Sequence, residues 1–167
     1  MIAAFRMEAF AKYFQQAGHS VTVVTEGETD EMKLWCGCNV YYVKDPLITP
    51  SYQERCVKEG KKWVPRRIAN ALLTRLTADF KFVWRWSAYK KTASLCKANS
   101  FDVVLSSFGP LAPHMVAYKL RKKGYRFYWI ADMRDEMSKS IFKSRYQVRS
   151  LIPYERKIVN SSDLVVS

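Results

Sequence analysis

Two polar loops of this sequence each follow a predicted strand, and they hold residue types suited to chemistry. Val103 to Leu105 form a short apolar run typical of a buried strand, and Ser106–Pro110 follows it. Phe127–Ala131 is a second predicted strand, rich in aromatic and branched residues, and Asp132–Asp135 follows that one. Ligands of open parallel sheets bind beyond the carboxyl ends of the strands. We therefore expect function to lie in these two loops.

The residues of the two loops leave more than one role open. The Asp132 carboxylate either faces a ligand or satisfies backbone donors of its own turn. Arg134 can pair with a phosphate or with a nearby acid, and Asp135 is expected to cap the helix that follows. Gly109 would let a ligand approach the backbone. His114 either binds a ligand or is a packed or exposed side chain without such a role.

The segment between the loops predicts a helix, so Phe101–Asp135 forms a strand–helix–strand unit. Pro110 and Pro113 stand where a helix can begin, and Gly124 stands where it can end. A parallel pair of strands requires such a crossover. This unit favours an α/β fold with a Rossmann-like parallel sheet flanked by helices.

The beginning of the chain predicts a helix and then a strand. Met7, Phe10, Ala11 and Phe14 form one apolar face of a helix over residues 2–17, which Gly18 ends. A strand over residues 21–25 follows. A doubly wound sheet normally begins with a strand, so either this sheet lacks its first strand, which we expect, or the fold simply starts with a helix. The edges exposed by that gap would favour a homodimer.

The rest of the chain predicts shorter elements and a long helical region. Residues 32–35 and 40–43 are candidate strands of a hairpin. Residues 68–99 are mostly helical, as one helix or as two with a joint near Asp79. Trp84 and Trp86 lie on different sides, so that one is exposed or meets another surface and the other packs in the core. A helix near residues 153–160 and a strand near 163–167 come last. We expect residues 1–167 to form a single domain.

Composition indicates a globular protein without a metal site. The chain has 167 residues, of which 49% are hydrophobic and 14% aromatic. It has no apolar run of the roughly 20 residues that span a bilayer and no secretory signal, so we expect a cytoplasmic location. Cys36 and Cys38 are separated by one residue, which is too close for usual zinc-ligand spacing. We therefore expect no metal.

A strong positive charge implies an anionic partner. The 28 basic and 15 acidic residues give a net charge of +13, which fits nucleic acid, a membrane surface or phosphorylated ligands. No helix-turn-helix, zinc-finger or RNP-type motif is present, which argues against nucleic acid. Basic residues that cluster at the end of one predicted helix suit an anionic membrane surface: Lys119, Arg121, Lys122, Lys123 and Arg126.

Four segments follow one another along the chain: AKYFQQAGHSVTVVT, FDVVLSSFGPLAPHMVAYKLRKKG, WIADMRD and YERKIVNSSDLVVS. In this order they resemble the amino-terminal half of a GT-B glycosyltransferase, and of glycosyltransferase family 4 in particular. The resemblance implies two Rossmann-like domains around a cleft, of which residues 1–167 would form the acceptor side. The sugar-nucleotide domain, the first strand and its Gly-rich loop have no match here. Arg6 matches the family's Arg near the start of the first helix.

The resemblance implies transfer of a sugar from a sugar nucleotide to a glycan or lipid-linked acceptor in cell-surface polysaccharide synthesis, without a cofactor and with retention. Asp132 would contact the acceptor hydroxyl. The residues expected to bind the acceptor or a phosphate are Arg6, Ser106, Ser107, Gly109, His114, Arg134 and Asp135. The donor would bind mainly to the other domain, so this chain alone would be inactive. The excess of basic residues fits a cytoplasmic protein that is peripheral at the inner face of the membrane. A non-catalytic scaffold and a basic nucleic-acid-binding domain remain alternatives.

Overall fold

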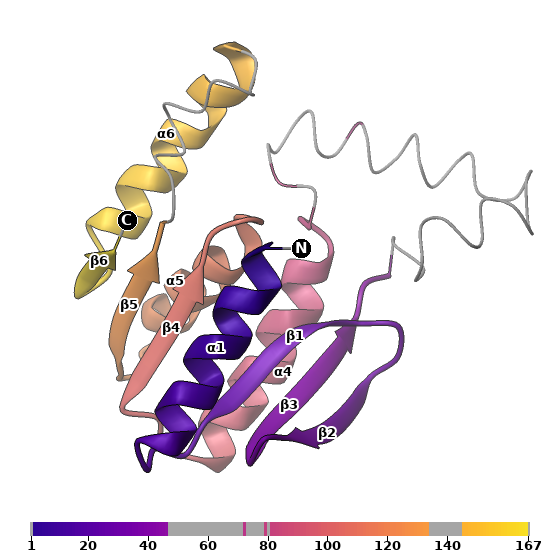
Figure 1. The fold of residues 1–167 in the computed structure, drawn as a ribbon. Helices are drawn as coiled ribbons and strands as arrows, with labels where there is room; N and C mark the ends of the chain where they lie inside the picture. The colour runs from indigo at the N-terminus through magenta and orange to yellow at the C-terminus, as the bar shows by residue number, and fades with distance from the viewer. Residues whose placement is uncertain (1, 47–71, 73–78, 80, 134–144, 167) are drawn as a thin grey trace, which may run out of the picture.

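The computed structural model describes residues 2–46, 72, 79, 81–133 and 145–166, which form a mixed α/β structure (Figure 1). Its elements in chain order are α1 (Ile2–Gln16), β1 (Thr22–Gly27), β2 (Glu31–Trp35), β3 (Cys38–Lys44), α4 (Trp84–Ala98), β4 (Val103–Ser107), α5 (Ala112–Lys122), β5 (Tyr128–Asp132), α6 (Arg145–Val159) and β6 (Leu164–Val166). The predicted first helix, hairpin and strand–helix–strand unit are therefore confirmed.

The strands form two sheets within the described residues, whereas the sequence predicted one parallel sheet. The first sheet has the order β1-β3-β2, with β1 parallel and β2 antiparallel to β3. The second has the order β4-β5-β6 and is parallel throughout. The antiparallel pair follows from the turn at Cys36 and Gly37, whose φ angles are 47° and 78°. A two-residue turn with positive φ at both positions joins adjacent antiparallel strands.

Helices connect the two sheets. The Trp84 indole of α4 donates a hydrogen bond of 2.9 Å to the Val43 carbonyl of β3, and α5 packs against both α4 and β4. On α1, the Ala11 carbonyl accepts a 3.5 Å hydrogen bond from the Cys38 thiol. Figure 1 shows α1 along the boundary between β4 and β1, with α4 and α5 behind it.

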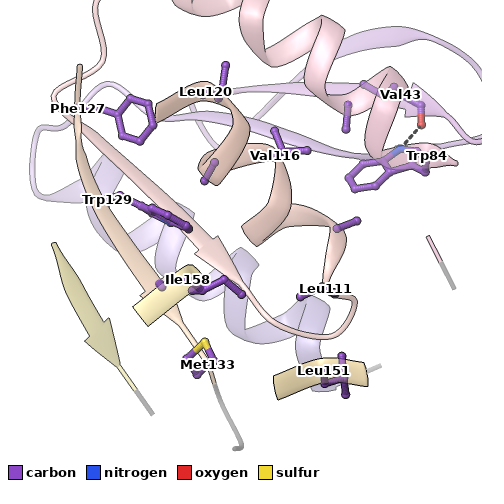
Figure 2. Packing of buried hydrophobic residues seen from close by; sticks show 14 residues of the cluster. Val43, Trp84, Leu111, Val116, Leu120, Phe127, Trp129, Met133, Leu151 and Ile158 are labelled. Atoms are coloured by element: carbon purple, nitrogen blue, oxygen red, sulfur yellow. Dashed lines mark hydrogen bonds between the residues drawn. The ribbon is translucent and has the colours of Figure 1, made fainter. Parts of the chain in front are cut away.

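One hydrophobic cluster serves both sheets (Figure 2). Val43 comes from the first sheet and Trp129 from the second, and Leu120 of α5 lies with them in the cluster. Leu151 and Ile158 of α6 complete its other side and are 1% and 0% exposed. Because all these elements bury side chains in the same cluster, the sheets share a core although none of their described strands pair with each other.

The edge position of β4 explains one wrong prediction. The run from Val103 to Leu105 was expected to be buried, but Val103 is 51% exposed, and Val104 and Leu105 are half-buried. No described strand pairs with β4 on the side away from β5. The apolar side chains of β4 are therefore only partly covered by other described residues.

The apolar face of α1 is also incompletely covered. Of its predicted members only Ala11 is buried, Met7 and Phe10 are half-buried, and Phe14 is 39% exposed. The helix ends as expected before Gly18, which has a φ of 90°. The described residues thus cover the apolar face of α1 fully only at Ala11 and leave its other side chains partly in contact with solvent.

The last helix begins earlier than predicted. Pro153 was expected to start a helix, but it lies inside α6, which begins at Arg145. A proline within a helix removes one backbone hydrogen bond and crowds the preceding turn. Leu151 and Ile158 pack in the core on either side of Pro153, so burial holds the helix together across it.

The two tryptophans of α4 provide a test of this packing. Trp84 is 5% exposed and Trp86 is 50% exposed, as the prediction of one packed and one exposed indole requires. We expect Trp84→Phe to lower the free energy of unfolding by about 1–3 kcal/mol, because it removes the hydrogen bond to Val43 and leaves a small cavity. Trp86→Phe should change it by less than about 0.5 kcal/mol. Urea denaturation of both variants checks this, and equal effects would contradict the packing.

Candidate functional site

The carboxyl ends of β4 and β5 bring the two predicted loops together. In this parallel pair Ser106 lies opposite Ala131, and Ser107 lies opposite Asp132. The backbone N–H of Phe108 donates a 2.8 Å hydrogen bond to the Asp132 carbonyl, which joins the loop after β4 to the end of β5. The first residues of both loops therefore form one edge of the sheet.

A buried carboxylate lies at the centre of this edge. Asp132 is 1% exposed, and its Oδ2 accepts a 2.8 Å hydrogen bond from the Ser107 hydroxyl. Its Oδ1 lies 3.0 Å from Nη2 of Arg6, which is close enough for an ion pair, although the angle does not make a hydrogen bond. We call Arg6, Ser107 and Asp132 the Asp132 cluster.

The Asp132 cluster combines a buried anion with a partly exposed cation. The Arg6 side chain is 36% exposed, so its guanidinium reaches from solvent to the carboxylate. A guanidinium has five N–H donors in a planar fork, and those not directed at Asp132 can bind a phosphate or carboxylate. The carboxylate itself is buried, so a ligand hydroxyl can reach it only where the Arg6 side chain moves aside. The accessible part of the cluster is therefore the Arg6 guanidinium, which is suited to an anionic ligand.

Ser106 takes part in a separate, buried network. Its Oγ accepts a 2.8 Å hydrogen bond from Nε1 of Trp129 and lies 2.7 Å from Nδ1 of His114. If the Ser106 hydroxyl proton is directed at Nδ1, the imidazole proton lies on Nε2, which has no hydrogen-bond partner among the described residues. Burial lowers the pKa of His114 to about 4, so the ring is neutral at pH 7.

The burial of this network separates two predicted site residues from solvent. Ser106 is 4% exposed and His114 is 0% exposed, and both hold the loop against Trp129. Their predicted ligand role stays a prediction. Gly109 is exposed on the same loop with a φ of 96°, a conformation that favours glycine. Arg134 and Asp135 lie outside the described residues.

A second polar cluster, which the sequence did not predict, lies at the first sheet. The Lys81 ammonium pairs with Glu26 and lies 3.5 Å from Oδ2 of Asp45. The Lys81 backbone N–H donates a 3.0 Å hydrogen bond to Asp79, whose pKa is raised by burial. Glu26 belongs to the end of β1, and Asp45 directly follows β3. The rule that favoured Asp132 would thus have indicated these two acids as well.

Among the described residues, no group of three or more His, Cys, Asp or Glu side chains is arranged to hold a metal ion. The helices in this part of the chain include none with the length and apolar character needed to cross a membrane. Comparison with protein-family models, with curated proteins and with solved structures gave no match. Interpretation of the site therefore depends on its geometry and on the sequence motifs.

The buried imidazole predicts a pH dependence of stability. Its folded pKa of about 4 lies below the ordinary value of 6.5, so its contribution is complete above pH 6.5 and is lost as the pH falls through about 4. The loss approaches about 3 kcal/mol at 1.4 kcal/mol per pKa unit. Urea denaturation between these pH values should show a smaller slope of stability against pH for His114→Gln.

The exposed His19 provides the matched control, since His19→Gln removes an imidazole that is not buried. We expect His19→Gln to keep the slope of the original protein. If His114→Gln keeps it too, the imidazole of His114 does not titrate as its burial requires. Because slopes are compared, an overall loss of stability in either variant does not affect the conclusion.

Proposed function

We propose that the sheet edge around Asp132 is the acceptor-side wall of a glycosyltransferase cleft of the GT-B type. The observation that carries the proposal is the ion pair between Arg6 and Asp132, with 3.0 Å between Nη2 and Oδ1. The sequence motifs selected these residues separately, one from the first helix and one from the end of a distant strand. Their contact at the carboxyl ends of β4 and β5 supports one ligand site.

In this function the Asp132 cluster would act on the acceptor. The Asp132 carboxylate would accept a hydrogen bond from the attacking hydroxyl and hold it toward the sugar. As the bond between sugar and diphosphate breaks and the new glycosidic bond forms, the hydroxyl proton must leave, and in this proposal the Asp132 carboxylate would receive it. Arg6 would neutralise phosphate charge on a lipid-linked acceptor or on the departing nucleotide.

The proposal assigns donor binding to another domain. The sugar nucleotide would be held mainly by a second Rossmann-like domain across the cleft, and transfer would proceed with retention and without a metal. This domain alone would bind acceptors without catalysing transfer. The substrate class is a glycan or lipid-linked acceptor for cell-surface polysaccharide synthesis.

We also propose that the two sheets are parts of one Rossmann-like sheet that lacks a strand between β1 and β4. No described strand pairs with β1 on the side away from β3, or with β4 on the side away from β5. Figure 1 shows β1 and β4 as the inner strands, running in the same direction on either side of α1. Arg6 brings the start of α1 to the carboxyl end of β5. A parallel strand between β1 and β4 would therefore end where α1 begins.

Acceptor binding tests the proposed function. We expect the protein to bind polyprenyl-diphosphate-linked glycans in saturation-transfer NMR, and to bind nucleoside-diphosphate sugars much more weakly. Asp132→Asn should weaken acceptor binding by about 10- to 100-fold, the effect of losing one charged hydrogen bond. Asp102→Asn is the matched control, because Asp102 is exposed just before the amino end of β4.

Two outcomes would contradict the proposal. Tight binding of sugar nucleotides would place the donor site in this domain, and equal effects of the two Asn variants would remove Asp132 from the site. Binding of neither substrate class would favour a non-catalytic scaffold. Circular dichroism of each variant shows whether a loss of binding results from unfolding.

A fused strand tests the proposal that a strand is missing. We expect a Val- and Ile-rich segment, joined to the start of α1 by a short glycine loop, to raise the melting temperature and to slow amide hydrogen exchange in β1 and β4. The control is the same fusion with proline at alternate positions, which cannot complete the hydrogen bonds of a strand. Equal exchange in both fusions would show that no strand enters between β1 and β4.

A further inference from the structure

Helices α4 and α5 present a surface with only positive charge. Their sequences, WRWSAYKKTASLCKA and APHMVAYKLRK, contain seven Lys or Arg residues and no Asp or Glu. Arg121 is neutralised by a bidentate pair with Asp163, with N–O distances of 2.7 and 3.1 Å. The other basic residues of these two helices form no ion pair with a described acidic residue, and Lys90, Lys97 and Lys122 are exposed.

An indole lies within this charged surface. The Nζ of Lys119 lies 3.8 Å from the ring centroid of Trp86 and 4.1 Å from that of Tyr89. Trp86 is nevertheless 50% exposed. The pKa of Lys119 is lowered by partial burial and then by the charges of Arg85 and Lys123. Trp86 therefore presents a half-exposed ring beside the Lys119 ammonium group.

A hollow beside the indole provides polar groups suited to a phosphate. It has a volume of about 540 Å³, and its lining includes Tyr89, Lys90, Ser94, Lys97 and Tyr125. The two ammonium groups and three hydroxyl groups of these residues can donate hydrogen bonds to phosphate oxygens. Tyr89 contributes both to the hollow and to the contact with Lys119, so the indole and the hollow belong to one surface.

We propose that this α4–α5 face docks on the surface of an anionic phospholipid bilayer, with Trp86 among the headgroups and lipid phosphates in the hollow. Tryptophan favours the membrane interface because its ring is apolar and its N–H is polar. Lysines near an anionic bilayer add an electrostatic attraction. A nucleic acid fits less well, because Lys119 covers the Trp86 ring on which a base would stack. The proposal does not depend on glycosyl transfer.

Vesicle flotation tests the proposal with the whole protein. We expect it to float with vesicles that contain phosphatidylglycerol, to remain behind with phosphatidylcholine alone, and to dissociate as salt is added. The variant K90E/K97E reverses two exposed charges of the hollow and should weaken binding by about 30-fold or more. The control K12E/K157E changes the net charge equally on α1 and α6, where both lysines are exposed, and should retain most of the binding.

The fluorescence of Trp86 reports the orientation of the bound protein. Lipids brominated near the headgroup should quench part of the tryptophan emission on binding, and Trp86→Phe should abolish that quenching. Equal binding to neutral vesicles, equal losses in the two double variants, or quenching that persists in Trp86→Phe would overturn the proposal. Binding of duplex DNA or RNA without binding to vesicles would overturn it as well. Acceptor binding at Asp132 can fail or succeed independently of every one of these results.

Discussion

The buried charge of Asp132 is the constraint on which the arrangement of the site depends. A carboxylate that is 1% exposed is stable only with compensating partners, and these come from distant parts of the chain. Ser107 reaches it from β4 and Arg6 reaches it from α1. Because Ala11 of the same helix contacts Cys38, α1 is held to both sheets. The ion pair that compensates the Asp132 charge thus helps to hold α1 at the boundary between the two sheets.

The alternation of side chains along β4 separates two functions within one pair of serines. Successive residues of a strand point to opposite faces, so Ser106 and Ser107 cannot join the same cluster. Ser106 enters the buried network with Trp129 and His114, whereas Ser107 contacts the carboxylate. The first network holds the loop, and the second contact orients Asp132. A sequence pattern that treats both serines as ligands cannot make this distinction.

Local sequence signals predicted most of the helices and strands. The pairing of the strands and the contact between Arg6 and Asp132 depend on long-range contacts, which these signals do not contain. Gly18, Pro113 and Gly124 determine the backbone conformation locally, so the end of α1 and both ends of α5 could be predicted from the sequence. Pro153 led to a wrong prediction of where α6 begins, because burial of the residues around it outweighs its tendency to interrupt a helix. The division into two sheets depends on which strands pair. The Asp132 side of the site was predicted from its strand end, but its contact with Arg6 required the fold.

Helix α5 links the proposed docking face to the site edge. His114, in its first turn, anchors the loop after β4, and the basic residues of its last turn belong to the charged face. With a rise of about 1.5 Å per residue, His114 and Lys122 are separated by only about 12 Å along the helix axis. A bilayer that contacts the charged end would therefore lie one short helix away from the loop that His114 anchors. If both proposals hold, a lipid-linked acceptor could stay in the membrane while its hydroxyl reaches the carboxylate, and docking would orient the site as well as attach the protein.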